Sequence, residues 1–454
     1  MMSVRKESPL ITDLYQLTML KGYFDLGMEE VAVFEFFVRD LPEKRNFLVA
    51  AGLEQVLDFL EGLHFSAEDL GWLKSLGMFS EDFIEYLGGL RFGGDVYAMP
   101  EGTIFFPDEP ILRVTAPLPQ AQLVETRIIN LLHFQTLIAS KAVRMQLAAP
   151  GRQFIDFGLR RAHGSEAGLM AARASYLAGF SGTSTLLAGQ VFDIPVFGTM
   201  AHSFVQAHDT EVAAFENFAV SQPGNVTLLI DTYDTEAGAR KVVGLAPELQ
   251  KKGISIRAVR LDSGDLVEHS RRVRRILDNG GLKDVRIFTS GNLDEYVLKH
   301  FSDNNAPIDA FGIGTMMVTS SDAPYLNCAY KLQEYAGIPR RKRSEGKATW
   351  PGAKQVYRCF DRDGIMSHDI LTLNDDLLGE KALLKPVMQN GMRIGLPVPL
   401  VESREYLQEQ MKALPPYLRR LDKGPDYPVR VSQSLRDCTM NVDKRTLKAE
   451  HGEK

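Results

Sequence analysis

Six short apolar runs in the middle of the chain each end in a cluster of polar residues. The runs cover residues 153–155, 194–197, 226–230, 254–259, 285–288 and 308–311. Segments with helical periodicity separate them, and strands that alternate with helices in this way indicate βαβ units and a parallel sheet. In a parallel α/β barrel the carboxyl ends of all strands open on one face. We therefore expect the six polar clusters to meet in one pocket.

The segments on either side of this alternation mix helix and strand signals. Residues 31–38 are rich in β-branched and aromatic side chains, which favours a strand. Residues 403–421 have the spacing of an amphipathic helix. We predict an N-terminal α+β module at 1–130, a parallel α/β barrel with the active site at 131–335, and a C-terminal segment at 336–454 that packs back on the N-terminal module.

The composition argues against several classes of function. A chain of 454 residues with 44% hydrophobic and 24% charged residues is typical of a globular protein with a large core. The net charge of -6 argues against a nucleic-acid protein that relies on a basic surface. Three widely spaced cysteines form neither a disulfide framework nor a zinc motif. Since no apolar run suits a signal peptide or a membrane span, we expect a cytoplasmic protein with no membrane or nucleic-acid partner.

Two of the polar clusters have the composition of phosphate-binding loops. Ser290 and Gly291 follow one predicted strand, and Gly312, Gly314 and Thr315 follow the next. Backbone N–H groups in such loops, and the free N–H groups of the helix that follows, bind anions. Each loop alone is more typical of a tight turn. Two of them on successive strands favour a phosphate site.

Carboxylates gather at two further strand ends. Asp231 ends one run, and Arg260 and Asp262 alternate at the end of the next, so that both can point into the mouth of the barrel. Paired carboxylates can hold Mg²⁺ directly or through water. Helix capping is the alternative, because Asp234 and Asp265 stand where N-caps are expected. We assign capping to Asp265, and function, including candidate Mg²⁺ ligation, to Asp231 and Asp262.

The remaining clusters contain groups that suit a small planar anion. Phe157 stands three residues before Arg160, so an aromatic face and a guanidinium can meet one ligand, and residues 181–185 would close that pocket with hydroxyls. His202 starts a helix after a strand, where a carboxylate can orient its ring. A lone histidine there is more often structural. Tyr15, near the N-terminus, is equally compatible with an ordinary core position.

In combination these clusters resemble the nicotinate phosphoribosyltransferase family over nearly the whole chain. Any one motif is weak, but their order and spacing are similar to those of the family. The matching stretches are residues 12–19, 156–164, 198–203, 231–235, 260–266, 311–315, 330–332 and 347–354.

The resemblance implies an irregular α/β barrel, a homodimer with composite active sites, and an enzyme that uses ATP and Mg²⁺. The reaction would convert nicotinate, 5-phosphoribosyl 1-diphosphate, ATP and water to nicotinate mononucleotide, diphosphate, ADP and phosphate. It would pass through a phosphohistidine and serve the salvage route of NAD biosynthesis.

The resemblance also implies roles for individual residues. His202 would be phosphorylated by ATP, while Asp231 and Asp262 would orient it or bind the ribose and the metal. The nicotinate site would comprise the partner subunit's Tyr15 together with Phe157, Arg160, Ser184, Thr199 and Arg260. The phosphates would bind at Ser290, Gly291, Gly312, Gly314 and Thr315.

Three other functions are compatible with the same motifs. The related nicotinamide phosphoribosyltransferases have an aspartate at the position of Ser184, where a carboxylate would accept from an amide and repel nicotinate. A quinolinate-using relative would need more cationic groups and no ATP. A barrel that binds nucleotides without catalysis would keep the same pocket residues.

Overall fold

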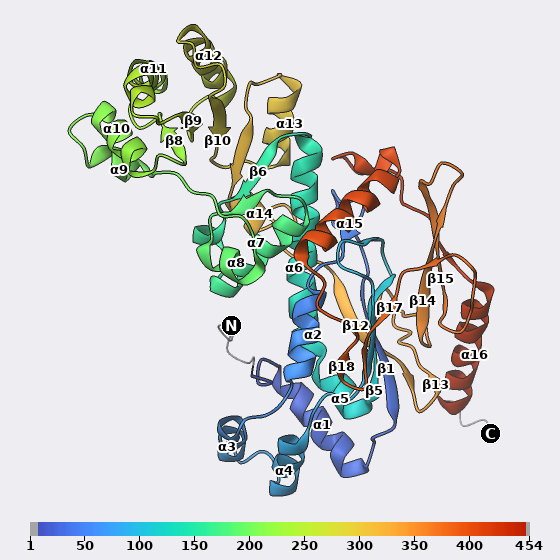
Figure 1. The fold of residues 1–454 in the computed structure, drawn as a ribbon. Coiled ribbons are helices and arrows are strands. Elements are labelled where there is room, and N and C mark those ends of the chain that lie inside the picture. Colours follow the sequence, from blue (N-terminus) through green and yellow to red (C-terminus); the bar gives the residue numbers. More distant parts are fainter. Residues whose placement is uncertain (1–7, 451–454) are drawn as a thin grey trace. The chain divides into compact units, whose positions relative to one another are not determined.

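The computed structural model describes residues 8–450 (Figure 1). Contacts divide the chain into two compact units. The first contains the described residues up to Leu137 and those from Tyr325 onward, and the second is Ile138–Pro324. The two terminal segments therefore belong to one α+β unit, and a parallel α/β unit lies between them in the sequence, which confirms the predicted fold class. The boundaries predicted at 130 and 335 stay a prediction.

A seven-stranded antiparallel sheet forms the centre of the first unit. β1 (Val31–Val38) pairs with β5 (Pro110–Pro117) on one side and β12 (Cys328–Tyr335) on the other. All of its residues after Val31 are buried, because its apolar and aromatic side chains pack on both faces of the sheet. The strand predicted at 31–38 is thus confirmed. The other strands of the sheet are β3 (Asp95–Ala98), β13 (Ile338–Pro339), β17 (Lys385–Gln389) and β18 (Met392–Arg393).

Two smaller sheets and a set of helices complete the first unit. The first small sheet has two strands, β2 (Leu48–Val49) and β4 (Ile104–Phe105). The second has four strands in the order β16 (Lys381–Ala382), β14 (Lys354–Phe360), β15 (Met366–Leu373) and β19 (Val429–Val431). The helices are α1 (Leu14–Leu26), α2 (Leu53–Gly62), α3 (Ala67–Ser75), α4 (Glu81–Gly89), α5 (Leu118–Leu123), α15 (Leu400–Ala413) and α16 (Gln433–Glu450). The helix predicted at 403–421 is wrong at its C-terminal end, because Pro415 and Pro416 follow and cannot continue it.

A parallel six-stranded sheet forms the second unit, in the order β7, β6, β11, β10, β9, β8. Its strands are β6 (Gln153–Asp156), β7 (Gly182–Thr183), β8 (Val226–Leu229), β9 (Ile256–Leu261), β10 (Arg286–Thr289) and β11 (Ala310–Ile313). The helices are α7 (Ser165–Leu177), α8 (Leu186–Phe192), α9 (His202–Gln206), α10 (Glu211–Ser221), α11 (Thr235–Lys251), α12 (Leu266–Asn279), α13 (Glu295–Asp303) and α14 (Thr315–Val318). The long α6 (Glu125–Ala148) precedes β6.

The run 194–197 connects the two edges of this sheet without forming a regular strand. Val196 makes an isolated parallel bridge with Thr183 of β7. Gly198 directly follows the run. Its carbonyl accepts a hydrogen bond at 3.0 Å from Nδ2 of Asn225, the residue before β8. The strand predicted here is therefore wrong, because Pro195 has no N–H to donate to a ladder. The parallel sheet is a half-barrel whose gap this segment spans.

Aspartate caps fix the starts of two helices that follow strand ends. The Asp234 carboxylate accepts from Ala237 N at 2.6 Å at the start of α11. The Asp265 carboxylate accepts from Val267 N and Glu268 N, both at 3.1 Å, at the start of α12. The capping role predicted for Asp265 is confirmed, and these two carboxylates stabilise helix N-termini.

Candidate active site

A pocket at the carboxyl ends of the parallel strands brings together side chains that are far apart in the sequence. We call this cavity of about 400 Å³ the mouth pocket. Seven of the residues that line it were predicted from the sequence as site residues: Phe157, Arg160, Ser184, Thr199, His202, Arg260 and Asp262. Three of the six polar clusters, those that begin at Asp156, Gly198 and Arg260, therefore meet in this pocket. The clusters that begin at Asp231, Thr289 and Gly312 are not part of its lining, so the expected convergence of all six is only partly met.

Arg260, at the end of β9, connects three of the strand ends. Its guanidinium donates to Ser290 Oγ at 2.8 Å from Nε and to Thr199 Oγ1 at 3.1 Å from Nη1. The same group donates to Asp262 Oδ1 at 3.2 Å and lies 5.5 Å from the ring centroid of Phe157. A guanidinium held in this way over an aromatic ring presents fixed donors to a planar anion.

Asp262 stays ionised because its surroundings favour the charged form. Burial raises the pKa of this carboxyl, but the hydrogen bond from Ser290 and the charge of Arg260 outweigh burial and hold the pKa below its ordinary value. The Ser290 hydroxyl donates to Asp262 Oδ1. Ser290 thus joins the carboxylate to Arg260 and fixes the relative position of the two strand ends.

His202 is the first residue of α9, a helix of five residues. Its Nε2 lies 3.9 Å from Asp262 Oδ2, and its side chain is 41% exposed. Its Nδ1 lies 3.1 Å from Thr232 Oγ1. Thr232 is a contact that sequence reasoning missed, although its position directly after Asp231 at the end of a strand was a usable signal. The ring is anchored at Nδ1, and its side chain is partly exposed.

Asp231 shapes the loop that follows β9. Its Oδ2 accepts from the Asp262 backbone N–H at 2.7 Å and from Ser263 Oγ at 2.8 Å. Its Oδ1 is buried and has no hydrogen-bond partner within residues 8–450. A buried carboxylate oxygen with a free lone pair beside Asp262 fits a Mg²⁺ ion, which prefers carboxylates, water and phosphate oxygens. The described residues contain no cluster of three or more acidic, histidine or cysteine ligands that could hold a metal without such outside ligands.

The predicted phosphate loops differ in their surroundings. Ser290 and Gly291 line a second cavity of about 360 Å³ between the loops after β9 and β10. Gly312 lies inside β11, where a Cβ atom would come within 2.7 Å of the Phe157 ring and 2.9 Å of the Phe288 ring. Gly314 and Thr315 follow directly and start α14, outside the linings of both cavities.

Asp156 is a buried carboxyl group that holds the turn next to the mouth pocket. It is only 1% exposed and accepts from Thr183 Oγ1 and from Gly158 N, both at 2.7 Å. Burial raises the pKa of this carboxyl to about 6. These bonds fix the turn that carries Phe157. Sequence reasoning did not select Asp156, and Ser184 is attached to it through a bond from Ser184 N to Asp156 O at 2.8 Å.

Tyr15 belongs to the first unit. It lies on α1 with a side chain that is 47% exposed, so it is not a core residue. Among the described helices, none combines the length and the apolar character needed to cross a membrane.

The fold and the mouth pocket define an α/β half-barrel protein with cationic and hydroxyl groups gathered at the carboxyl face of its sheet. Comparison with known proteins narrows the class. The chain matches the N-terminal domain of nicotinate phosphoribosyltransferase over residues 10–133, the nicotinate phosphoribosyltransferase family over 152–338, and its C-terminal domain over 380–439. The chain belongs to the nicotinate phosphoribosyltransferase family.

Individual relatives agree along nearly the whole chain. The chain is 48% identical to nicotinate phosphoribosyltransferase pncB2 of Mycobacterium tuberculosis over 437 residues, which covers 96% of this chain and 94% of the relative. It is 36% identical to the Bacillus subtilis nicotinate phosphoribosyltransferase, with the same coverage of both. The crystal structure of human nicotinic acid phosphoribosyltransferase superimposes with a TM-score of 0.86 at 30% identity, covering 95% of this chain and 99% of that one.

Proposed function

We propose that the protein transfers the phosphoribosyl group of 5-phosphoribosyl 1-diphosphate to nicotinate, forming nicotinate mononucleotide and diphosphate in NAD salvage. The observation that carries this proposal is the guanidinium of Arg260, fixed by Thr199, Ser290 and Asp262 at the Phe157 ring. Membership of the family supports the same assignment. Nicotinate has an aromatic ring and a carboxylate, which match an aromatic face and a fixed cation.

The proposed reaction mainly requires that the nicotinate ring is positioned and that the charge on the sugar is stabilised. When the pyridine nitrogen attacks the ribose carbon and the C–O bond to diphosphate breaks, positive charge develops on the sugar. Asp262, whose pKa is held low, is ionised and stands where it can stabilise that charge. The side chains of Phe157 and Arg260 would hold the ring in line for attack. Ser290, Gly291, Gly312, Gly314 and Thr315 remain the proposed phosphate contacts.

We further propose that ATP phosphorylates His202. A ring nitrogen attacks the γ-phosphorus, the bond to ADP breaks, and water later hydrolyses the phosphohistidine. With Nδ1 anchored at 3.1 Å from Thr232, Nε2 is the nucleophile in this proposal. Asp231 and Asp262 would hold Mg²⁺, which would neutralise phosphate charge when bound. The side chains themselves orient His202 and order the loop after β9.

The remaining proposals concern assembly and location. We propose a homodimer in which the partner subunit's Tyr15 completes the nicotinate site. The half-exposed position of Tyr15 on α1 supports this proposal, since a core tyrosine could not serve a second chain. We propose a cytoplasmic location because all the substrates named here are small cellular metabolites.

The test uses ATP labelled on its γ-phosphate. Wild-type protein should acquire an acid-labile, base-stable label that the His202→Ala variant lacks. His208→Ala is the matched control, because this neighbouring histidine contacts Phe204 O at 2.7 Å through Nδ1, lies outside the lining of the mouth pocket, and should leave labelling intact. Labelling that survives in His202→Ala would exclude the phosphohistidine step.

Comparing the turnover of nicotinate and of nicotinamide tests whether the enzyme prefers the acid to the amide. Ser184 offers a neutral hydroxyl in the mouth pocket, so nicotinate should be turned over faster than nicotinamide. Ser184→Asp should reverse the preference, because a carboxylate there repels the acid and accepts from the amide. A wild-type preference for nicotinamide would contradict the proposed function.

A further inference from the structure

The half-barrel has a second cavity at the opposite end of its strands. It has a volume of about 110 Å³, and we call it the rear cavity. Residues at the amino ends of strands line it: Gln153 starts β6, Arg286 starts β10, and Ala310 starts β11. Arg257, the second residue of β9, completes this rim. The carboxyl-end clusters that form the mouth pocket belong to the other end of the same strands.

The charged residues that line the rear cavity are two arginines. Arg257 and Arg286 are exposed, and neither has an ion-pair partner in the part of the chain that the structure describes. Arg286 donates from Nη1 only to the neutral amide of Gln153, at 3.3 Å. No carboxylate is among the residues that line the cavity. An anion at this rim would meet two guanidinium groups.

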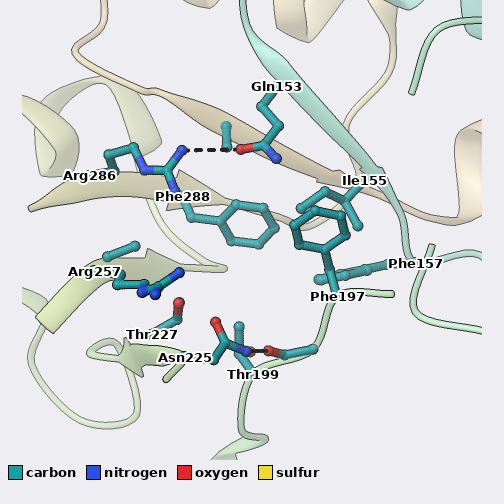
Figure 2. Close-up of a pocket in the computed structure, with 13 residues that line it drawn as sticks. Gln153, Ile155, Phe157, Phe197, Thr199, Asn225, Thr227, Arg257, Arg286 and Phe288 are labelled. Atoms are coloured by element: carbon teal, nitrogen blue, oxygen red, sulfur yellow. Dashed lines mark hydrogen bonds between the residues drawn. The ribbon is translucent and has the colours of Figure 1, made fainter. Parts of the chain in front are cut away.

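The walls of the rear cavity are aromatic and apolar. Figure 2 shows the two guanidinium groups on one side of the cavity and the rings of Phe288, Phe197 and Phe157 on the other. Glycines allow these rings to pack closely against the sheet. A Cβ at Gly182 would come within 2.6 Å of the Phe197 ring, and one at Gly312 within 2.9 Å of the Phe288 ring. The walls are therefore set by the strands and present flat faces to a ligand.

The rear cavity and the mouth pocket share part of their linings. Phe157, Gly198 and Thr199 line both cavities. The Phe157 ring faces the Arg260 guanidinium at 5.5 Å and the Phe288 ring at 5.6 Å between centroids. A ligand in the rear cavity would thus contact the ring that forms the wall of the proposed nicotinate site.

We propose that the rear cavity is a second binding site, open at the amino ends of the strands, for a small aromatic carboxylate. The two arginines would pair with the carboxylate, and Phe288, Phe197 and Ala310 would enclose the ring. A phosphate or sulfate would use the arginines and leave these apolar walls unsatisfied, so the aromatic acid fits the whole cavity better. This site shares Phe157 and Thr199 with the substrate site of the proposed function but uses two other arginines, and its occupancy can be measured without turnover.

The experiment measures benzoate binding by titration calorimetry on the full chain carrying Arg260→Ala, which removes the guanidinium of the mouth pocket. We expect one equivalent of benzoate to bind per chain. Adding Arg257→Ala and Arg286→Ala together should weaken that binding by about tenfold or more. Arg275→Ala is the matched control, because this arginine of α12 lies outside the lining of the rear cavity and should leave affinity unchanged.

A second variant and a neutral ligand separate the cavity from a general charge effect. Ala310→Leu keeps both arginines and fills the rear cavity, so it should also weaken benzoate binding, and thermal melting would show that each variant is folded. Benzamide, which has the ring without the charge, should bind at least about tenfold more weakly than benzoate. Absence of benzoate binding in the Arg260→Ala chain, unchanged binding in the double arginine variant, or equal affinity for benzamide would each overturn the proposal. These experiments measure binding and not turnover. Their results can therefore be interpreted even if the protein does not catalyse the proposed reaction.

Discussion

Thr232 shows how one hydroxyl group can decide which atom of a catalytic candidate reacts. When Thr232 Oγ1 accepts from Nδ1–H of His202, the lone pair of the imidazole is on Nε2, the nitrogen that lies near Asp262. A hydroxyl is a small group, and although Thr232 directly follows Asp231 at a strand end, its residue type does not separate it from the other polar residues at the strand ends. For this reason the sequence pointed to His202 but not to the residue that orients it.

Replacing Thr232 by valine should slow phosphorylation of His202 by about fivefold to tenfold, which corresponds to the loss of one hydrogen bond. Valine has the same shape, so the loop should keep its structure. The measurement is the initial rate of labelling with γ-labelled ATP across a pH series, because a change of tautomer preference would also alter the pH profile. Thr232→Ser should restore the wild-type rate. Equal rates in the valine and wild-type proteins would argue against a positioning role.

Asp156 predicts a pH dependence of stability at the residue scale. Its folded-state pKa of about 6 lies above the ordinary value of 3.8, so the unfolded chain loses this proton at lower pH than the folded protein. The stability that it contributes is complete below pH 4 and falls as the pH rises to about 6, by on the order of 3 kcal/mol. Melting curves between pH 4 and 7 should show this decline in wild type, and the decline should be smaller in Asp156→Asn. An identical pH dependence in both proteins would count against this assignment.

At the scale of elements, β11 determines where the wall of the mouth pocket stands. The strand passes directly behind the rings of Phe157 and Phe288, and only a glycine at position 312 leaves room for them. The sequence presented Gly312 as part of a phosphate loop. The structure places Gly312 inside β11, because Gly312 pairs with Ile155 and Ile313 pairs with Asp156 of β6.

Gly312→Ala should displace the Phe157 ring and raise the KM for nicotinate, with a loss of stability of about 1–3 kcal/mol from overpacking. Steady-state kinetics and urea denaturation measure the two effects. Gly244→Ala in α11 is the control, since nothing lies within 4 Å of a Cβ at that position. That variant should be at least as stable as wild type, because alanine favours a helix. A Gly312→Ala protein with wild-type KM would contradict the packing argument.

The regular elements could be predicted from the sequence better than the features that connect them. Periodicity and strand-end clusters indicated the parallel sheet, because side-chain patterns directly reflect burial on a strand. The irregular connection through Val196 could not be predicted in detail, because one isolated bridge to Thr183 and one hydrogen bond from the Asn225 amide hold it in place. The rear cavity had no signal either, because Arg257 and Arg286 look like ordinary solvated residues until the strands are aligned.

At the scale of the molecule, the first unit contains a charged cluster that connects segments far apart in the sequence. Arg358 and Asp369 are both fully buried, and Arg358 Nη2 donates to Asp369 Oδ2 at 2.6 Å. Tyr427 donates to Asp369 Oδ1 at 3.1 Å. Burial, together with the charge of Asp369, raises the pKa of the nearby Glu109 well above its ordinary value. One arginine therefore neutralises a site that contains two carboxyl groups.

Arg358→Met should destabilise the protein by about 3–5 kcal/mol, because Asp369 would stay buried without its cation. Urea denaturation followed by circular dichroism measures the change. Arg362→Ala, at an exposed turn between β14 and β15, should change stability by less than about 0.5 kcal/mol. A loss for Arg358→Met no larger than that of the control would show that the pair contributes little.

The shared wall at Phe157 has a consequence for regulation. If an aromatic acid in the rear cavity shifts this ring, it changes the affinity of the mouth pocket for nicotinate by some factor. Thermodynamic linkage then requires nicotinate to change the affinity of the rear cavity by the same factor. Through this one aromatic side chain, binding at one end of the half-barrel would change the affinity at the other end. The concentration of an aromatic acid would then change the nicotinate concentration that the enzyme needs.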